Sequence, residues 1–189
     1  GLKAGREFLP QIVVFGASRG VGLEVVKQAL EAGHVVTAFV RSPKKCIVKD
    51  TNLNVFKGDS MDTETVEKAI AGQDAVISAL GPTRPPVPHM MEISAKNIVA
   101  GMKKHGVRRL VTTTGAGVRQ PEDQPKFIDH FIGFLLNLLA KDVVLDSAAN
   151  VQAIRESDLD WTVVRFPRLM DGEHKGRYQA GYVSKSSGT

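Results

Sequence analysis

The segment VVFGASRGVGLEVV, residues 13–26, constrains the fold of this chain more than any other stretch. Its three glycines, Gly16, Gly20 and Gly22, follow the apolar run 11–16 and precede a segment whose apolar residues repeat with helical spacing. Glycine allows a tight turn with positive φ and leaves the main chain open to a ligand. The order strand, bare turn, helix N-terminus predicts a pyrophosphate site at the first strand-to-helix turn of a dinucleotide-binding fold.

The rest of the chain alternates apolar runs with segments of helical periodicity. Strands are predicted at 34–41, 53–59, 74–81, 108–115 and 160–167, and helices at 62–72, 90–105 and 126–156, the last as one long helix or two short ones. Most of the strands are continuously apolar and helices separate them, which favours a parallel sheet covered on both faces. With no repeat or linker, residues 1–189 are expected to form one doubly wound α/β domain of the Rossmann type.

Composition excludes several classes of function. The net charge of +5 comes from scattered basic residues, with no basic stripe interleaved with aromatics, so nucleic-acid binding is not expected. Cys46 is the only cysteine, which rules out an intrachain disulfide, provides no thiolate pair for a metal and suits the cytoplasm. The longest apolar run, 131–140, is far shorter than the ~20 residues of a membrane span. A small-molecule ligand is therefore the expected partner.

Basic residues at the end of the second predicted strand favour NADP over NAD. An NAD site places an acid there for the ribose hydroxyls, whereas this strand is followed by Arg41, Lys44 and Lys45. An arginine can bind a 2′-phosphate through two parallel hydrogen bonds, and Arg19 is placed to close the same phosphate from the other side. The alternative is a solvated basic loop.

Two further strand ends lie where a cofactor is expected. Asp59 and Ser60 follow the third strand and are placed near the adenine, and Ala79, Leu80 and Gly81 follow the fourth strand and are placed along the cofactor. In the alternative interpretation, the glycines only turn the chain and Asp59 caps the next helix.

Several longer segments resemble one family. GASRGVG is similar to the glycine motif of the short-chain dehydrogenases/reductases. Four other segments resemble the atypical, NmrA-like NAD(P)-binding branch of that superfamily, and above all its biliverdin-IXβ reductase/flavin reductase group. They are GHVVTAFVRSPKK, GQDAVISALG, AKNIVAGMKKHGVRRLV and IRESDLDWTVVRFPRLMDG. The resemblance spans about residues 11–182. Chains of that group continue through another strand and a closing helix, so this chain is expected to lack a C-terminal part.

The resemblance implies a Rossmann domain that binds NADP(H), as a monomer or weak homodimer, and reduces flavins or tetrapyrroles or acts as a redox sensor. It implies pyrophosphate and adenosine contacts from Gly16, Ser18, Arg19, Gly20, Val21 and Gly22, and 2′-phosphate contacts from Arg41 and Lys45. It implies adenine contacts from Asp59 and Ser60, and nicotinamide-ribose contacts from Ala79, Leu80, Gly81, Thr113 and Thr114. Pro167 and Arg168 would border the nicotinamide and substrate, with Thr114 and Arg168 on the substrate. Two positions depart from the biliverdin reductases, which have serine at Gly115 and histidine at Arg168.

The sequence lacks the proton donor that carbonyl reductases of the superfamily use. Those enzymes need Tyr-x-x-x-Lys, but the two tyrosines are Tyr178 and Tyr182, and none lies in 126–156. A flavin, quinone or tetrapyrrole spreads the added charge over its π system and can take its proton from solvent. The sequence therefore predicts an NADPH-dependent reductase of a conjugated acceptor, with a non-catalytic NADP-binding regulator or assembly factor as the alternative.

Four other side chains have two interpretations each. Met90 and Met91 either line a substrate pocket or, as we favour, begin a packed helix. Asp142 and Asp146 share a helical face and either touch substrate or, as we favour, form a solvated surface.

Overall fold

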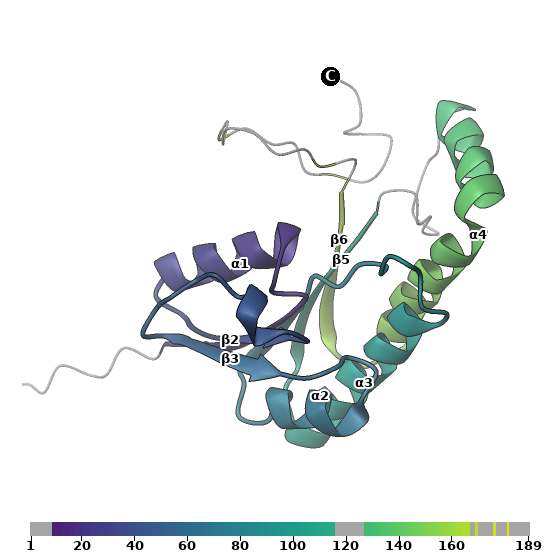
Figure 1. Cartoon of the computed structure of the whole chain (residues 1–189). Coiled ribbons are helices and arrows are strands. Elements are labelled where there is room, and N and C mark those ends of the chain that lie inside the picture. Colours follow the sequence, from purple (N-terminus) through teal and green to yellow (C-terminus); the bar gives the residue numbers. More distant parts are fainter. Residues whose placement is uncertain (1–8, 116–126, 167–168, 170–175, 177–180, 182–189) are drawn as a thin grey trace, which may run out of the picture.

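The computed structural model describes residues 9–115, 127–166, 169, 176 and 181, with side chains at all of these except 45 and 127–140 (Figure 1). The strands in this part are β1 (Gln11–Phe15), β2 (Val35–Val40), β3 (Leu53–Lys57), β4 (Ala75–Ser78), β5 (Arg109–Gly115) and β6 (Asp160–Phe166). The helices are α1 (Gly20–Glu31), the 3₁₀ turn η1 (Pro43–Lys45), α2 (Thr63–Ile70), α3 (Met90–His105) and α4 (Phe127–Arg155). The segment predicted as one helix or two is thus one helix.

The six strands form one parallel sheet in the order β3-β2-β1-β4-β5-β6. The predicted parallel α/β fold is confirmed. The chain first runs from β1 outward to the edge strand β3 and then returns to β4, on the other side of β1. The order therefore reverses between β1 and β4, where Phe15 is paired with Ser78, and this switch point is where open α/β sheets bind ligands.

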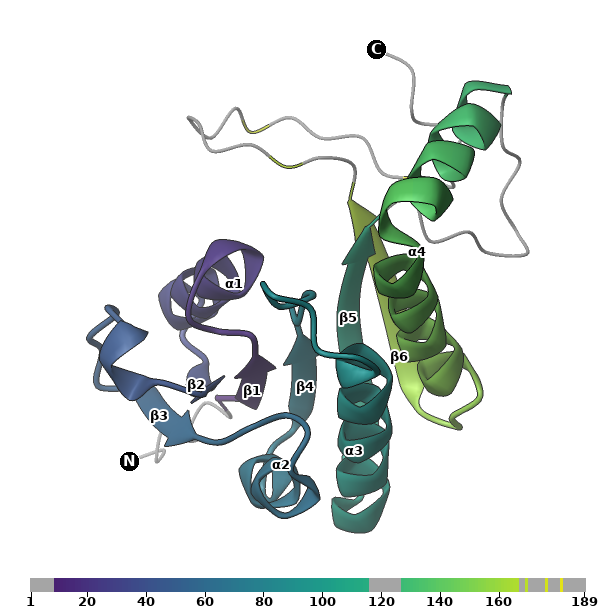
Figure 2. The same cartoon turned by 45° about the vertical axis from the view of Figure 1, so that its right-hand side comes forward.

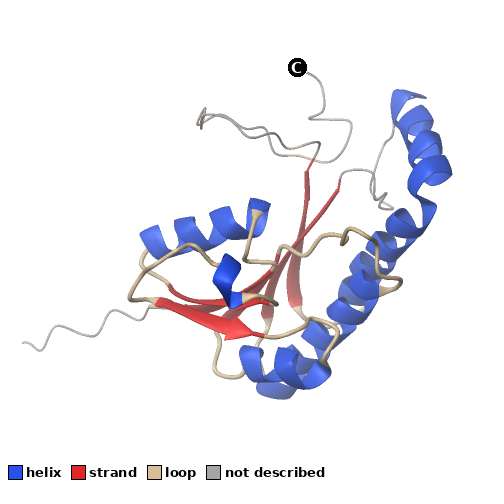
Figure 3. Cartoon of the chain, in the orientation of Figure 1, coloured by secondary structure: helices blue, strands red, loops and turns tan. Residues whose placement is uncertain are grey.

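Helices cover both faces of the sheet, as predicted, but unequally. Among the described helices, α1 packs on one face and α2, α3 and α4 on the other (Figure 2). Figure 3 shows the strands between these two layers of helices. On the α1 face, Val14 packs with Val26 of the helix, and on the opposite face Phe15 packs in one cluster with Ile98 and Ile154. This burial of alternate β1 side chains on opposite faces holds the switch point rigid.

Local sequence signals set the ends of the helices that flank the site. Gly33, with φ of +86°, follows the C-terminus of α1. Asp62 caps α2 through its Oδ1 atom, which accepts hydrogen bonds from the backbone N–H groups of Glu64 and Thr65. α3 begins differently, because His89 precedes it in a left-handed conformation and provides no side-chain cap.

No helix within the described ranges combines the length and the apolar character that crossing a bilayer would require.

Candidate cofactor and acceptor cleft

The glycine-rich turn brings three elements into close contact. Gly16 has φ of +79°, and a Cβ atom on it would lie 2.5 Å from the carbonyl oxygen of Ala79, just past β4. A Cβ atom on Gly22, in the first turn of α1, would collide with the carbonyl oxygen of Gly16. The turn after β1 therefore lies directly against both the end of β4 and the start of α1.

The N-terminus of α1 is open to an anion. Arg19 occupies the N-cap position with an extended backbone, and its side chain does not cap the helix. The first N–H groups of a helix lack intrahelical partners and carry partial positive charge, so an uncapped N-terminus beside a bare turn suits a pyrophosphate.

A cavity of about 710 Å³ runs along the carboxyl ends of the strands. Most of the residues predicted for the cofactor or substrate line it, namely Gly16, Ser18, Arg19, Gly20, Val21, Arg41, Asp59, Ser60, Ala79, Leu80, Gly81, Thr113 and Thr114. Gly22 does not line the cavity and instead packs against Gly16. The side chain of Lys45, and Pro167 and Arg168 entirely, lie outside the described residues. Cofactor contacts at all these positions stay predictions.

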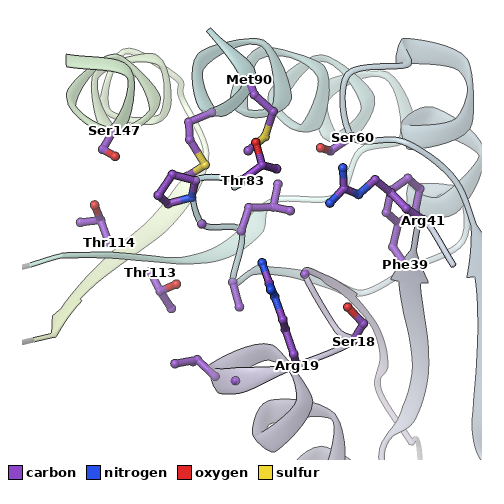
Figure 4. A pocket seen from close by; sticks show the side chains of 18 of the residues that line it. Ser18, Arg19, Phe39, Arg41, Ser60, Thr83, Met90, Thr113, Thr114 and Ser147 are labelled. Atoms are coloured by element: carbon purple, nitrogen blue, oxygen red, sulfur yellow. The ribbon is translucent and has the colours of Figure 1, made fainter. Parts of the chain in front are cut away.

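Two guanidinium groups extend into one half of the cavity, from the ends of β1 and β2 (Figure 4). The guanidinium groups of Arg19 and Arg41 form no ion pair or hydrogen bond with another described residue. By contrast, Lys27, Lys68 and Lys96 pair with carboxylates on their own helices. Exposed guanidinium groups without a side-chain partner, next to a bare turn, suit phosphate oxygens as ligands.

Hydrogen bonds to α3 hold the loop after β3 in place. Ser60 is buried, its hydroxyl accepts a 2.8 Å hydrogen bond from Ser94, and its carbonyl accepts one from Asn97 at 3.0 Å. Asp59 accepts a 2.9 Å hydrogen bond from the backbone N–H of Met61. The interpretation of Asp59 as the cap of α2 is wrong, because Asp62 fills that role.

Phe39 lines the cavity and was not predicted there. Its ring stacks on Phe56 and is tilted against Phe15. In the sequence, Phe39 therefore looks like any apolar strand residue that packs in the core. Gly58 makes room for it, since a Cβ there would lie 2.5 Å from the ring. Nothing local distinguishes a strand-end aromatic that lines a cavity from one that only fills the core.

The other half of the cavity is apolar, with hydroxyl groups. Beyond the switch point it is lined by Pro82, Thr83, Val87, Met90, Met91, Thr113, Thr114, Gly115, Ser147, Phe166 and Leu169. Met90 and Met91 are only 6% and 4% exposed, so they are both the packed start of α3 and part of the wall. Ser147, contributed by α4, was missed because no local signal separates it from other small polar helix residues. Its hydroxyl and that of Thr114 lie on the same side of the cavity (Figure 4).

Among the described residues that line the cavity, charge is confined to one half. Among the described residues that line it, Arg19, Arg41 and Asp59 carry charge, and all three follow β1, β2 or β3. The described residues that line the other half, beyond β4 and β5, include no acid, base or tyrosine. Outside the cavity, the hydrogen bond with Lys96 lowers the pKa of Glu92. The cavity thus offers cations for phosphates at one end and apolar surface with hydroxyls at the other.

A parallel sheet in this order, with a bare turn and an uncapped helix at the switch point, defines a dinucleotide-binding α/β protein. The chain belongs to the NAD(P)H-binding family, whose model matches residues 16–189.

Relatives and solved structures agree with that family. The chain is 29% identical over 156 residues to the (4-alkanoyl-5-oxo-2,5-dihydrofuran-3-yl)methyl phosphate reductase of Streptomyces griseus, covering 82% of this chain. It spans 46% of the length of that enzyme. The anaerobillin reductase ChuY of Escherichia coli O157:H7 has the same fold, with a TM-score of 0.72 and 21% identity over 91% of this chain and 81% of that one. A short-chain dehydrogenase/reductase of Veillonella parvula in complex with NADP also has this fold, with a TM-score of 0.68 and 18% identity over 84% of this chain and 69% of that one.

Proposed function

We propose that this chain is an NADPH-dependent reductase that transfers hydride to a conjugated acceptor such as a flavin, a quinone or a tetrapyrrole. The observation that carries the proposal is the division of the cavity into a cationic half and an apolar half without a described proton donor. The likeness of the fold to the anaerobillin reductase ChuY supports a place in the biliverdin-IXβ reductase/flavin reductase group.

The residues of the cationic half fit NADP. Arg41 follows β2, where the adenine ribose of a bound dinucleotide lies. The guanidinium groups of Arg41 and Arg19 have no partner among the described residues. The bare turn at Gly16 and the uncapped N-terminus of α1 suit the pyrophosphate. The NADP complex of the Veillonella protein, which shares the fold, supports the same choice of cofactor.

The apolar half fits a conjugated acceptor. NADPH, when bound, supplies the hydride from its nicotinamide. The chain orients the two reactants and excludes water, with Met90, Met91 and Val87 forming an apolar wall. The hydroxyls of Thr113, Thr114 and Ser147 are available to hydrogen-bond polar atoms of the cofactor or acceptor. Reduction of an isolated carbonyl needs a positioned acid, whereas a delocalised acceptor can be protonated by solvent.

Binding and turnover test the proposal separately. Titration with NADPH and NADH should show preference for NADPH. Arg41→Ala should weaken NADPH binding about tenfold or more, because a charge-assisted hydrogen bond contributes about 1.5–3 kcal/mol, and should leave NADH binding unchanged. Lys49→Ala is the matched control. Lys49 is exposed and does not line the cavity, so this substitution removes the same charge at a site away from the cavity. Unchanged NADPH affinity in Arg41→Ala would show that Arg41 does not bind the 2′-phosphate.

Riboflavin, FMN and dichlorophenolindophenol are suitable acceptors for the turnover assay. Oxidation of NADPH by at least one of them, above the rate without protein, is the expected result. Tight NADPH binding without turnover of any acceptor would instead favour the non-catalytic regulator or assembly factor, which the lack of a described proton donor equally permits.

A further inference from the structure

The first turn of α3 is capped by a residue 55 positions away in the sequence. His89 provides no side-chain cap, so the N–H groups of Met91 and Glu92 need another acceptor. Asp146 of α4 supplies it, because its Oδ2 atom accepts a hydrogen bond from Met91 and its Oδ1 atom one from Glu92, each at 3.0 Å. A carboxylate that accepts two hydrogen bonds at a helix N-terminus is also favoured by the helix dipole.

Asn150 extends this contact by one turn of α4. Its Nδ2 atom donates a 2.9 Å hydrogen bond to the carbonyl oxygen of Met91, and the residue is only 2% exposed. Met91 is therefore held through both its N–H group and its carbonyl group by side chains from one face of α4. We refer to Asp146 and Asn150 together as the α4 clamp.

The α4 clamp holds the wall of the apolar half of the cavity. Met90 and Met91 line that half, and the loop 82–89 that leads into α3 contributes Thr83 and Val87 to it. The loop is mostly exposed. Thr83 donates a side-chain hydrogen bond to the carbonyl of Pro85 and accepts one from the N–H of Val87, and His89 contacts Glu92 at 3.4 Å.

The same wall faces a second cavity of about 410 Å³ on its other side. Thr83, Val87 and Met90 line both cavities, and Leu145 of α4 lines the outer one. Because space lies on both sides of the loop, packing alone does not fix its position. The hydrogen bonds of the α4 clamp do so at the end of the loop where it joins α3.

We infer that Asp146 is a positioning residue for the acceptor, which sets the place of the Met90–Met91 wall without touching the acceptor itself. This inference rests on the proposed function. Loss of the carboxylate leaves two N–H groups of α3 unpaired, so the first turn opens and the wall moves. The NADPH half of the cavity is built on β1, β2 and β3, and its hydrogen bonds with α3 come from Ser94 and Asn97, beyond the first turn of that helix. Acceptor affinity therefore falls while NADPH affinity does not.

Three variants test this inference in the full chain, with FMN and dichlorophenolindophenol as acceptors. Asp146→Ala removes both hydrogen bonds, and Asp146→Asn keeps one carbonyl oxygen to accept one of them. Asp142→Ala is the matched control, because Asp142 lies one turn earlier on the same helix and is exposed, and its side chain makes no hydrogen bond or ion pair within the described part of the chain. The measurements are the KM and kcat for each acceptor, the Kd for NADPH, and amide hydrogen exchange at Met91 and Glu92.

We expect the acceptor KM to change while the Kd for NADPH does not. Asp146→Ala should raise the acceptor KM about tenfold or more, as the loss of two hydrogen bonds with a charged group predicts, while the Kd for NADPH stays within about twofold. Asp146→Asn should fall between this variant and the wild type, and Asp142→Ala should match the wild type. Faster exchange at Met91 and Glu92 should accompany the raised KM.

Two results would overturn the inference. One is an unchanged acceptor KM in both Asp146 variants despite faster exchange at Met91. The other is an equal loss of NADPH and acceptor affinity, which indicates general destabilisation. If Asp146→Ala does not fold, Asp146→Asn decides by the same criteria. A wild-type protein that reduces no acceptor refutes the proposed function instead, and the acceptor role of Asp146 with it.

Discussion

Replacement of Gly16 by alanine tests how tightly the switch point is built. A residue other than glycine in the left-handed region costs about 1–2 kcal/mol, and Gly16 has φ of +79°. The new Cβ would also lie 2.5 Å from the carbonyl oxygen of Ala79 and 2.8 Å from its carbonyl carbon. To reach an ordinary contact distance, the backbone after β4 must retreat by about 1 Å, and overpacking of this kind adds about 1–3 kcal/mol. We therefore expect Gly16→Ala to lower the free energy of unfolding by about 2–5 kcal/mol.

Two other glycines in the same cavity separate backbone strain from collision. Gly20 has φ of +54° but open space around a new Cβ, so Gly20→Ala should cost the strain alone, about 1–2 kcal/mol. Gly81 has neither a positive φ nor a neighbour within 4 Å of a new Cβ. Gly81→Ala should therefore change the free energy of unfolding by less than about 0.5 kcal/mol.

Urea unfolding followed by the fluorescence of Trp161, the single tryptophan, measures all three variants. Equal m-values are needed for the comparison. If Gly16→Ala is no less stable than Gly20→Ala, the close approach to Ala79 does not constrain the turn, and the argument from the collision is refuted. NADPH binding should weaken most in Gly16→Ala, because its displaced backbone lines the cavity.

Two further predictions concern α2. Asp62→Ala should lower the free energy of unfolding by about 1 kcal/mol, because it removes the N-cap of the helix; an unchanged urea midpoint would contradict this. Glu67 links α2 to α3 through a 2.7 Å ion pair with Lys104, and its hydrogen bond with that lysine lowers the pKa of the Glu67 carboxyl below its usual 4.5. Because the folded pKa is the lower one, the stabilisation is complete above the unfolded pKa and is lost as pH falls through the folded pKa. Thermal unfolding at about pH 6 and about pH 3 should therefore show that Glu67→Gln loses less stability on acidification than the wild type does. Equal losses of stability would contradict the role of the Glu67–Lys104 ion pair.

Local patterns predicted the elements of this fold well. The apolar run before Gly16 forms β1, and the segment predicted at 90–105 forms α3 with the same bounds. Gly33, a local signal for a helix end, follows the end of α1. These features depend on periodicity and on backbone conformations that glycine allows, both of which are visible within a few residues.

The site could be predicted only in part. Arg19, Arg41 and Asp59 line the cavity because the carboxyl ends of parallel strands meet at one edge of the sheet, so their places follow from strand ends alone. Phe39 and Ser147 could not be predicted, since a residue that lines a cavity and one that fills the core share the same local pattern. Asp146 was expected on a solvated face or at the substrate, yet it caps α3.

The sequence alone determined the alternation of strands and helices, the bare turn at Gly16 and the positive charge at Arg41, because each depends on neighbouring residues. Only the tertiary structure decided that Asp146 caps α3, that Ser147 reaches the cavity and that Met90 and Met91 form its wall. The contact between Asp146 and Met91 joins α4 to α3 across 55 positions of the sequence. Contacts over such a separation depend on how whole helices pack on the sheet.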